Sequence, residues 1–308
     1  MRVLVIGGTG FIGQQVVGRL VAQGDSVFVP TRRLPSAREL LVYPTVTVLP
    51  GDVYDPNVLD GLMNGMDAVI NLVGVLHGSA PKAGQPYGPE FERAHVELPK
   101  LVAQACVRAG VQRFVHVSAL GASAQGTSAY SRSKAAGEAA IMAVAKENPL
   151  LCVTILQPSV VFGPKDKFMN MFAGLARFFP VLPLAGSKAK MQPIYVVDLA
   201  QAIANCLVNK HTCGQTYEMA GPNVYTLGEL VTLAAKYSGH PRPVIDLPMS
   251  IGRMQAWFFE CLPGEPLMSR DNLDSLKTDN VATKPMDPVF GVIPTPLEAI
   301  VPSYLRKT

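Results

Sequence analysis

Short apolar runs rich in β-branched residues recur along the first half of this 308-residue chain, and each is followed by a longer segment of helical period. Continuous apolar strands that alternate with helices are typical of a parallel sheet covered by helices on both faces. The alternation therefore predicts a doubly wound α/β fold. The predicted strands are residues 2–6, 26–29, 46–49, 68–72, 113–117 and 152–157.

A glycine-rich segment, GGTGFIG, occupies residues 7–13, directly after the first predicted strand and directly before an amphipathic helix. In that context Gly7 permits a tight turn, Gly10 lets the backbone approach a pyrophosphate, and Gly13 lets the helix pack close to the strand. The N–H groups and the positive dipole end of the helix would then face the phosphates. This context predicts a Rossmann dinucleotide site. The predicted cofactor contacts here are Gly7, Thr9, Gly10, Phe11, Ile12 and Gly13.

The end of the second predicted strand bears on the choice between NAD and NADP. A site that prefers NAD usually has an acidic residue there, which accepts a hydrogen bond from the ribose 2′-hydroxyl. This chain instead has Arg32 and Arg33. A guanidinium can pair with a 2′-phosphate through two hydrogen bonds. We therefore expect NADP(H) as cofactor in preference to NAD(H); the alternative is that both arginines are solvated loop charges.

A tyrosine and a lysine lie four residues apart in YSRSK, at the start of a segment of helical period, so Tyr130 and Lys134 share one helix face. A phenol has an unperturbed pKa of about 10, so acid–base chemistry at neutral pH needs a nearby cation that favours the phenolate. Lys134 could supply that charge. The pair indicates general acid–base catalysis, the alternative being an exposed tyrosine beside a surface lysine.

The order of these motifs resembles the extended or atypical short-chain dehydrogenase/reductase superfamily, of the NAD-dependent epimerase/dehydratase-like kind. The other matching segments are GDVYD at 51–55, INLVG at 70–74, HVSAL at 116–120 and QPSVVFGP at 157–164. The resemblance implies that Lys134 also holds the nicotinamide ribose. It further implies adenine contacts by Asp52 and Val53, adenine-ribose contacts by Leu72, Val73 and Gly74, and a nicotinamide contact by the loop after Pro158.

Two positions depart from the family pattern. The catalytic serine of the family is usually the second serine of a VSS sequence, whereas this chain has Ser118 one position early and Ala119 in that place. Because a shift of one residue turns a strand side chain to the other face, Ser118 is a catalytic candidate that could shape the site without polarising a carbonyl. His95 stands where extended members commonly have asparagine, and we expect a core histidine there rather than a proton relay.

Beyond residue 165 the alternation gives way to proline-rich segments, with helices expected near 196–209 and 226–237. Asp198 is expected to cap the first of these helices, and Thr226 with Glu229 forms a capping-box pattern at the second. The predicted organisation is a Rossmann domain of residues 1–164 plus 192–222 and a smaller substrate or partner lobe of residues 165–191 plus 223–308.

Two apolar stretches, residues 169–186 and 249–268, lie in the smaller lobe, and the second holds the only tryptophan, Trp257. They could be ordinary core, a cleft for an apolar substrate, or a face that docks on a membrane surface or a large partner. The segment at 263–281, PGEPLMSRDNLDSLKTDNV, resembles the tail of the nucleotide-binding accessory subunit of respiratory complex I and its bacterial relatives. That resemblance implies tightly held NADPH in a protein linked to the respiratory quinone system.

Composition excludes several other classes of protein. The net charge of +4 comes without a basic block, so nucleic-acid binding is not expected. No run reaches the roughly 18 apolar residues of a membrane-spanning helix. The five cysteines lie at no metal-ligand spacing, so no metal site is predicted, and we expect reduced core thiols in a cytoplasmic protein that could sit at the inner membrane. Their positions are Cys106, Cys152, Cys206, Cys213 and Cys261.

Two functions follow from these patterns. The first is an NADP(H)-dependent oxidoreductase, or an epimerase/dehydratase-like enzyme, that acts on a small apolar or quinone-related substrate through Tyr130 and Lys134. The alternative is a non-catalytic accessory or assembly protein of the complex I type that holds NADPH as a structural cofactor. The intact Tyr130 and Lys134 pair favours the enzyme, whereas Ala119 and the tail favour the accessory protein.

Overall fold

A parallel seven-stranded sheet forms the centre of the computed structural model, which describes residues 1–264 and 266–306. Its strand order is β11-β6-β5-β4-β1-β2-β3, and every neighbouring pair is parallel. This order confirms the predicted doubly wound Rossmann fold. The strands are β1 (Arg2–Ile6), β2 (Ser26–Thr31), β3 (Val46–Pro50), β4 (Ala68–Asn71), β5 (Arg113–Val117), β6 (Cys152–Pro158) and β11 (Gln215–Met219).

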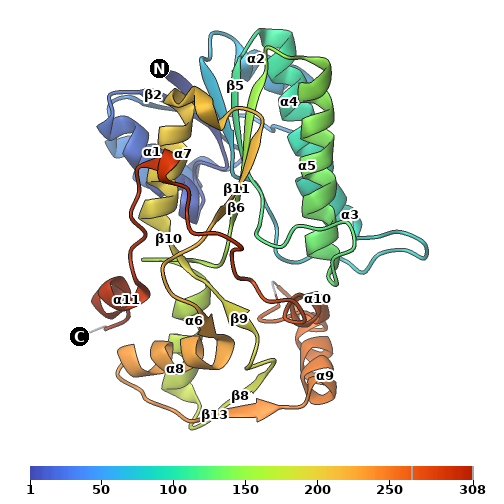
Figure 1. Ribbon diagram of the computed structural model, residues 1–308, viewed down its shortest axis with the longest axis vertical. Helices are drawn as coiled ribbons and strands as arrows, with labels where there is room; N and C mark the ends of the chain where they lie inside the picture. Colours follow the sequence, from blue (N-terminus) through green and yellow to red (C-terminus); the bar gives the residue numbers. More distant parts are fainter. Residues whose placement is uncertain (265, 307–308) are drawn as a thin grey trace.

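Helices cover both faces of this sheet (Figure 1). On one face α1 (Phe11–Ala22) packs beside α7 (Val196–Val208), and their apolar side chains share a core with β1 and β2. On the other face α2 (Pro56–Met63), α4 (Leu98–Ala109) and α5 (Ala129–Glu147) enclose a second core. The strands are buried on both sides, which explains why their sequences are continuous apolar runs.

Below the sheet in the view of Figure 1, α6 (Phe168–Phe178), α8 (Leu227–Tyr237) and α11 (Leu297–Leu305) enclose a third core cluster. Thr226 and Glu229 form the predicted capping box at the start of α8. We retain the division into two lobes as a proposal. The other elements are η1 (Leu34–Val42), α3 (Pro89–Phe91), η2 (Glu92–Glu97), β7 (Val161–Phe162), β8 (Leu182–Ala185), β9 (Lys190–Met191), β10 (Ile194–Tyr195), η3 (Lys210–Thr212), β12 (Tyr225–Thr226), β13 (Val244–Leu247), α9 (Met249–Glu260), α10 (Arg270–Ser275) and η4 (Pro288–Phe290).

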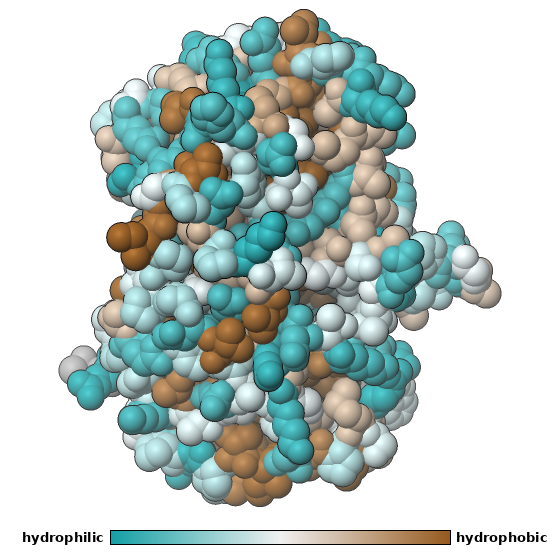
Figure 2. Space-filling model, viewed as in Figure 1, coloured by the Kyte–Doolittle hydropathy of each residue, from teal (hydrophilic) through white to brown (hydrophobic). Residues whose placement is uncertain are grey.

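The two apolar stretches of the smaller lobe differ in burial. The inner side of α6 contributes to the third core, although Phe178 at its end is 84% exposed. In α9 only Gly252 and Ala256 are buried. Hydrophobic residues are visible on the surface at the lower end of the molecule (Figure 2). The exposed apolar side chains of α9, called the α9 face below, are Ile251, Met254, Trp257 and Phe258. Within residues 1–264 and 266–306 no helix is long and apolar enough to cross a membrane.

Two expectations from the sequence are wrong. Cys152 and Cys213 form a disulfide, because β6 and β11 are neighbours in the sheet and bring together residues that lie 61 positions apart. Cys261 is exposed, so only Cys106 and Cys206 are buried free thiols. Asp198 does not cap α7: it lies in the first turn of the helix, and its carboxylate accepts hydrogen bonds from the backbone N–H and hydroxyl of Thr295.

Candidate dinucleotide and active site

The glycine loop turns tightly between β1 and α1. Gly7 has φ +84°, a conformation that favours glycine, and a Cβ there would come within 3.3 Å of the backbone of Leu72 and Val73. A Cβ on Gly13 would overlap the carbonyl oxygen of Gly7. No described side chain caps α1 at Gly10, and its first turn contains no acidic residue. The start of α1 therefore presents N–H groups and a positive dipole end that suit an anion.

The ends of β2 and β3 lie on the same edge of the sheet as the glycine loop. Arg32 and Arg33 follow β2 and are both exposed, and Arg33 N–H donates to the Thr31 hydroxyl. Asp52 follows β3, and its carboxylate accepts from the N–H of Tyr54. Burial raises the pKa of Tyr54, and the charges of Arg93 and Arg32 oppose that rise. Arg32 therefore lies near enough to the segment after β3 to act on it electrostatically.

Next to the glycine loop, the turn after β4 reaches toward α5. Asn71 accepts a hydrogen bond from the N–H of Val73. A Cβ on Gly74 would lie 3.2 Å from the amino group of Lys134. The predicted adenine-ribose turn at Leu72, Val73 and Gly74 thus lies close to Gly7 on one side and to Lys134 on the other. The fold brings these distant parts of the sequence together.

The start of α5 carries Tyr130 and Lys134. Burial lowers the pKa of Lys134 to about 8, and the charge of Glu138 opposes that shift. The Lys134 amino group lies 5.9 Å from the centroid of the Tyr130 ring and donates to the carbonyl oxygen of Val117. Burial raises the pKa of Tyr130 to about 12. The Lys134 amino group lies on the side of the Tyr130 ring, and burial favours the protonated phenol over the phenolate.

His95 lies behind Tyr130 and is a satisfied core histidine, as expected. Its Nε2 accepts from the N–H of Val75, and its Nδ1 is 2.8 Å from the hydroxyl of Ser133, which itself donates to the carbonyl oxygen of Tyr130. Burial, together with the nearby charge of Lys134, lowers the pKa of His95 to about 2. A neutral imidazole thus supports Tyr130 from the inside, with its ring edge-on to the phenol.

Ser118 directly follows β5, where its N–H donates to the carbonyl oxygen of Leu156. Its buried hydroxyl makes no hydrogen bond of ordinary length and angle to the described residues, although it lies near enough to Glu138 to oppose the rise in pKa that burial causes there. Glu138 also accepts from the amide of Gln157. Ser118 therefore faces the part of α5 one turn beyond Lys134.

The tail segment 263–281 supplies contacts to the site that sequence reasoning missed. The Asp271 carboxylate accepts from the N–H groups of Ala129 at 2.6 Å and Tyr130 at 3.0 Å. Asn280 donates to the carbonyl oxygen of Leu120 and accepts from the hydroxyl of Ser159, directly after Pro158. A carboxylate at the start of α5 complements the helix dipole. In the sequence, the resemblance of segment 263–281 to the tail of the complex I accessory subunit was the one sign that this segment could matter for the site.

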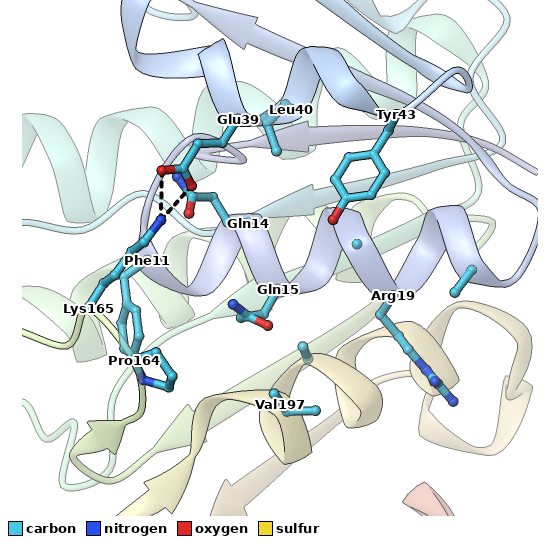
Figure 3. A pocket seen from close by; sticks show the side chains of 13 residues that line it. Phe11, Gln14, Gln15, Arg19, Glu39, Leu40, Tyr43, Pro164, Lys165 and Val197 are labelled. Carbon is cyan, nitrogen blue, oxygen red and sulfur yellow. Dashed lines mark hydrogen bonds and ion pairs between the residues drawn. The ribbon is translucent and has the colours of Figure 1, made fainter. Parts of the chain in front are cut away.

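A groove runs along the outer side of α1, between η1 and the start of α7 (Figure 3). An ion pair between Lys165 and Glu39 lies at one end of this groove. Among the predicted cofactor contacts only Phe11 lines the groove, so it is a feature separate from the edge of the sheet where the other candidate residues gather. Within the described part of the chain, no group of three acidic, histidine or cysteine side chains could hold a metal ion.

The parallel sheet, the glycine loop before α1 and the tyrosine–lysine helix together define a dinucleotide-binding α/β protein of the short-chain dehydrogenase type. Residues 3–220 match the NAD dependent epimerase/dehydratase family, and the chain belongs to that family.

Several relatives are similar along most of the chain. The mitochondrial NADH dehydrogenase [ubiquinone] 1 alpha subcomplex subunit 9 of Mus musculus is 32% identical, covering 98% of this chain and 79% of the relative. A ceramide reductase of Caulobacter vibrioides is 32% identical over 66% of this chain and 60% of its own length. Among solved structures, Pal from Bacillus thuringiensis has a TM-score of 0.77 at 16% identity, covering 99% of this chain and 98% of that one. At that identity the structural likeness concerns the fold alone.

Proposed function

We propose that this protein is an NADP(H)-binding oxidoreductase, or an epimerase/dehydratase-like enzyme, that acts on an apolar substrate and is linked to the respiratory quinone system. One observation carries the proposal: the turn at residues 72–74 lies so close to both Gly7 and Lys134 that a Cβ added at Gly7 or at Gly74 would be within 3.3 Å of its neighbour. This closeness supports a single site that includes the anion-binding loop and the tyrosine–lysine helix. A dinucleotide bound along the edge of the sheet would have its pyrophosphate at α1 and its nicotinamide near Tyr130.

The cofactor contacts that we propose are those predicted from the sequence. The loop of residues 7–13 would hold the pyrophosphate, Asp52 and Val53 the adenine, and the turn at 72–74 the adenine ribose. Lys134 and the loop after Pro158 would hold the nicotinamide end. The exposure of Arg32 and Arg33, and the effect of Arg32 on Tyr54, support a role in binding a 2′-phosphate, and hence NADP(H) over NAD(H).

The protonation of the site supports chemistry in the reductive direction. When bound, the reduced cofactor supplies a hydride. Tyr130, protonated because burial raises its pKa to about 12, would donate its proton to the oxygen of a substrate carbonyl. Lys134, with a pKa of about 8, retains its proton at neutral pH and would stabilise the phenolate left behind. Ser118 would shape the pocket beside α5.

Two observations support an apolar substrate and a cytoplasmic location peripheral to the inner membrane. The relatives include NADH dehydrogenase [ubiquinone] subunits and a ceramide reductase, whose names refer to ubiquinone and to ceramide. The α9 face leaves Met254, Trp257 and Phe258 more than half exposed, as expected of a surface that contacts a respiratory complex or lipid headgroups.

The second candidate function is that of an accessory protein which holds NADPH without turnover. Ala119 in the place of the family's serine favours it, because Ser118 then faces Glu138 and leaves no serine at that position to polarise a carbonyl. The similarity to complex I subunits along nearly the whole chain is compatible with it.

NADPH oxidation by the purified protein distinguishes the two functions. We expect oxidation with a short-chain ubiquinone analogue or a long-chain ketone, and at least a hundredfold loss of rate in Tyr130→Phe. Tyr237→Phe, in α8 of the other lobe, is the matched control and should retain the rate of the wild type. If NADPH binds but is oxidised no faster by the wild type than by Tyr130→Phe, the enzyme proposal fails and the accessory function stands.

A further inference from the structure

A cluster of sulfur and hydroxyl groups lies at the amino end of the sheet, opposite the edge that carries the candidate cofactor site. Cys152 is the first residue of β6, and Cys213 lies two residues before β11. Their disulfide joins the starts of two neighbouring parallel strands. Both residues are partly exposed, so a small thiol or disulfide in solution can reach them.

Arg113, the first residue of β5, points into this cluster and is only 7% exposed. Its guanidinium donates to the carbonyl oxygens of Cys206 and Cys152, and to the Cys152 sulfur at 3.0 Å. It also donates to the hydroxyls of Thr154 and Thr212 at 2.7 Å each. These acceptors are neutral, and among the described residues no carboxylate forms an ion pair with Arg113.

A buried cation without a counter-charge is an unfavourable arrangement that an adjacent anion would relieve. Of the acceptors around Arg113, the Cys152 sulfur becomes a stable anion once the disulfide is opened. A nearby guanidinium favours a thiolate over a thiol. In the oxidised state, Arg113 therefore already lies beside the Cys152 sulfur that becomes a thiolate on reduction.

We propose that Cys152 and Cys213 form a reversible thiol–disulfide exchange site in which Arg113 stabilises the Cys152 thiolate, and whose reaction partner is a low-molecular-weight thiol or its disulfide. On reduction, the thiolate of the partner attacks the Cys213 sulfur, the bond between the two cysteine sulfurs breaks, and Cys152 leaves as the thiolate. A second partner thiolate then attacks the mixed disulfide and releases Cys213. The protein disulfide gains two electrons, two partner thiols become one disulfide, and oxidation reverses each step.

The other titratable groups of the cluster are not equivalent to Cys152. Cys206, at the end of α7, is buried, and burial raises the pKa of its thiol to about 12 although Arg113 opposes the shift. Tyr217 of β11 interacts electrostatically with Arg113, and burial raises its pKa. Lys210 and His211 of η3 are the neighbouring basic groups before Cys213 in the chain. Arg113 is the charged group in hydrogen-bond contact with the Cys152 sulfur.

Alkylation of the reduced, folded, full-length protein tests the proposal. After treatment with dithiothreitol, the rate of iodoacetamide reaction at each cysteine is followed from pH 5 to pH 10 by peptide mass spectrometry. We expect the midpoint for Cys152 to lie at least one pH unit below that of the exposed Cys261, which is a tenfold larger thiolate fraction at low pH. Arg113→Gln should raise the Cys152 midpoint to that of Cys261.

If Arg113→Gln does not fold, Cys213→Ser provides a second test, because this variant leaves Arg113 intact beside a single Cys152 thiol. We expect the low Cys152 midpoint to persist in this variant. In glutathione buffers the wild type should pass reversibly between the dithiol and the Cys152–Cys213 disulfide. Equal midpoints for Cys152 and Cys261 in both the wild type and Cys213→Ser, or a Cys152–Cys213 bond that no ratio of glutathione to its disulfide forms, would overturn the proposal.

Discussion

Asp271 offers a quantitative test of how the tail supports the candidate catalytic helix. Its carboxylate accepts two hydrogen bonds from N–H groups at the start of α5, from Ala129 at 2.6 Å and from Tyr130 at 3.0 Å. Hydrogen bonds to a charged group contribute about 1.5–3 kcal/mol each, and the helix-dipole interaction adds about 0.3–1 kcal/mol. Asp271→Asn removes the charge but keeps one acceptor. We therefore expect a loss of roughly 2 kcal/mol in the free energy of unfolding, from the same contributions.

Thermal unfolding followed by circular dichroism measures this loss. For a protein of this size, with an unfolding entropy of about 2.1 cal/mol/K per residue, 2 kcal/mol corresponds to a fall in Tm of roughly 3 °C. Asp60→Asn is the matched control, because its pairing with Arg108 is an exposed ion pair and should contribute about 0–1 kcal/mol. Equal Tm values for Asp271→Asn and Asp60→Asn would refute the reasoning that the tail fixes the start of α5.

Three further predictions concern the cofactor site, the site's pH dependence and the disulfide. Gly13→Ala places a Cβ against the Gly7 carbonyl oxygen, so we expect the dissociation constant for NADPH to rise at least tenfold in a fluorescence titration. Gly61→Ala is the control, because a Cβ there meets open space. An unchanged dissociation constant in Gly13→Ala would contradict the loop geometry. NADPH oxidation should fall as the pH rises through about 8, because Lys134 loses there the proton that stabilises the phenolate, and a rate that stays flat to pH 10 would exclude that role. Reducing the Cys152–Cys213 bond should lower the free energy of unfolding by about 4 kcal/mol, because the bond closes a span of 61 residues and restricts the unfolded chain. Urea denaturation with and without dithiothreitol measures the difference in the free energy of unfolding.

The pH dependence of stability at Lys134 has a definite sign. Burial lowers its pKa to about 8 in the folded protein, below the usual lysine value of about 10.4. Between these values the unfolded chain binds more protons than the folded one, so this group makes the free energy of unfolding rise with pH in that window. Lys134→Met should remove this rise, which urea denaturation at pH 7 and pH 10 measures.

The sequence predicted the strands that are buried on both faces, because such strands are continuous apolar runs. The seventh strand, β11, escaped notice because its sequence QTYEM is mostly polar and lies exposed at the edge of the sheet. The same edge explains the missed disulfide: only the pairing of β11 with β6 brings Cys213 to Cys152. Local patterns carry no information about which distant strands become neighbours.

The candidate site was predictable where a motif has a local backbone reason. Residues 7–13 needed glycine for a tight turn and close packing, and the structure has that turn. The raised pKa of Tyr130 was not predictable, since the spacing to Lys134 gives their proximity but not the burial that raises the pKa of the phenol. Asp271 and Asn280 reach the site from the tail through long-range hydrogen bonds that no spacing rule anticipates.

The most direct test of the proposed cofactor is native mass spectrometry of the purified protein, mixed with equal concentrations of NADPH and NADH. We expect one NADPH per chain in the wild type, little NADH, and loss of the bound NADPH in Gly13→Ala. Reversal of the preference, in a protein that binds NADH at the same loop, would contradict the role given to Arg32 and Arg33. Absence of any bound dinucleotide in the folded wild type would contradict the proposed cofactor site as a whole.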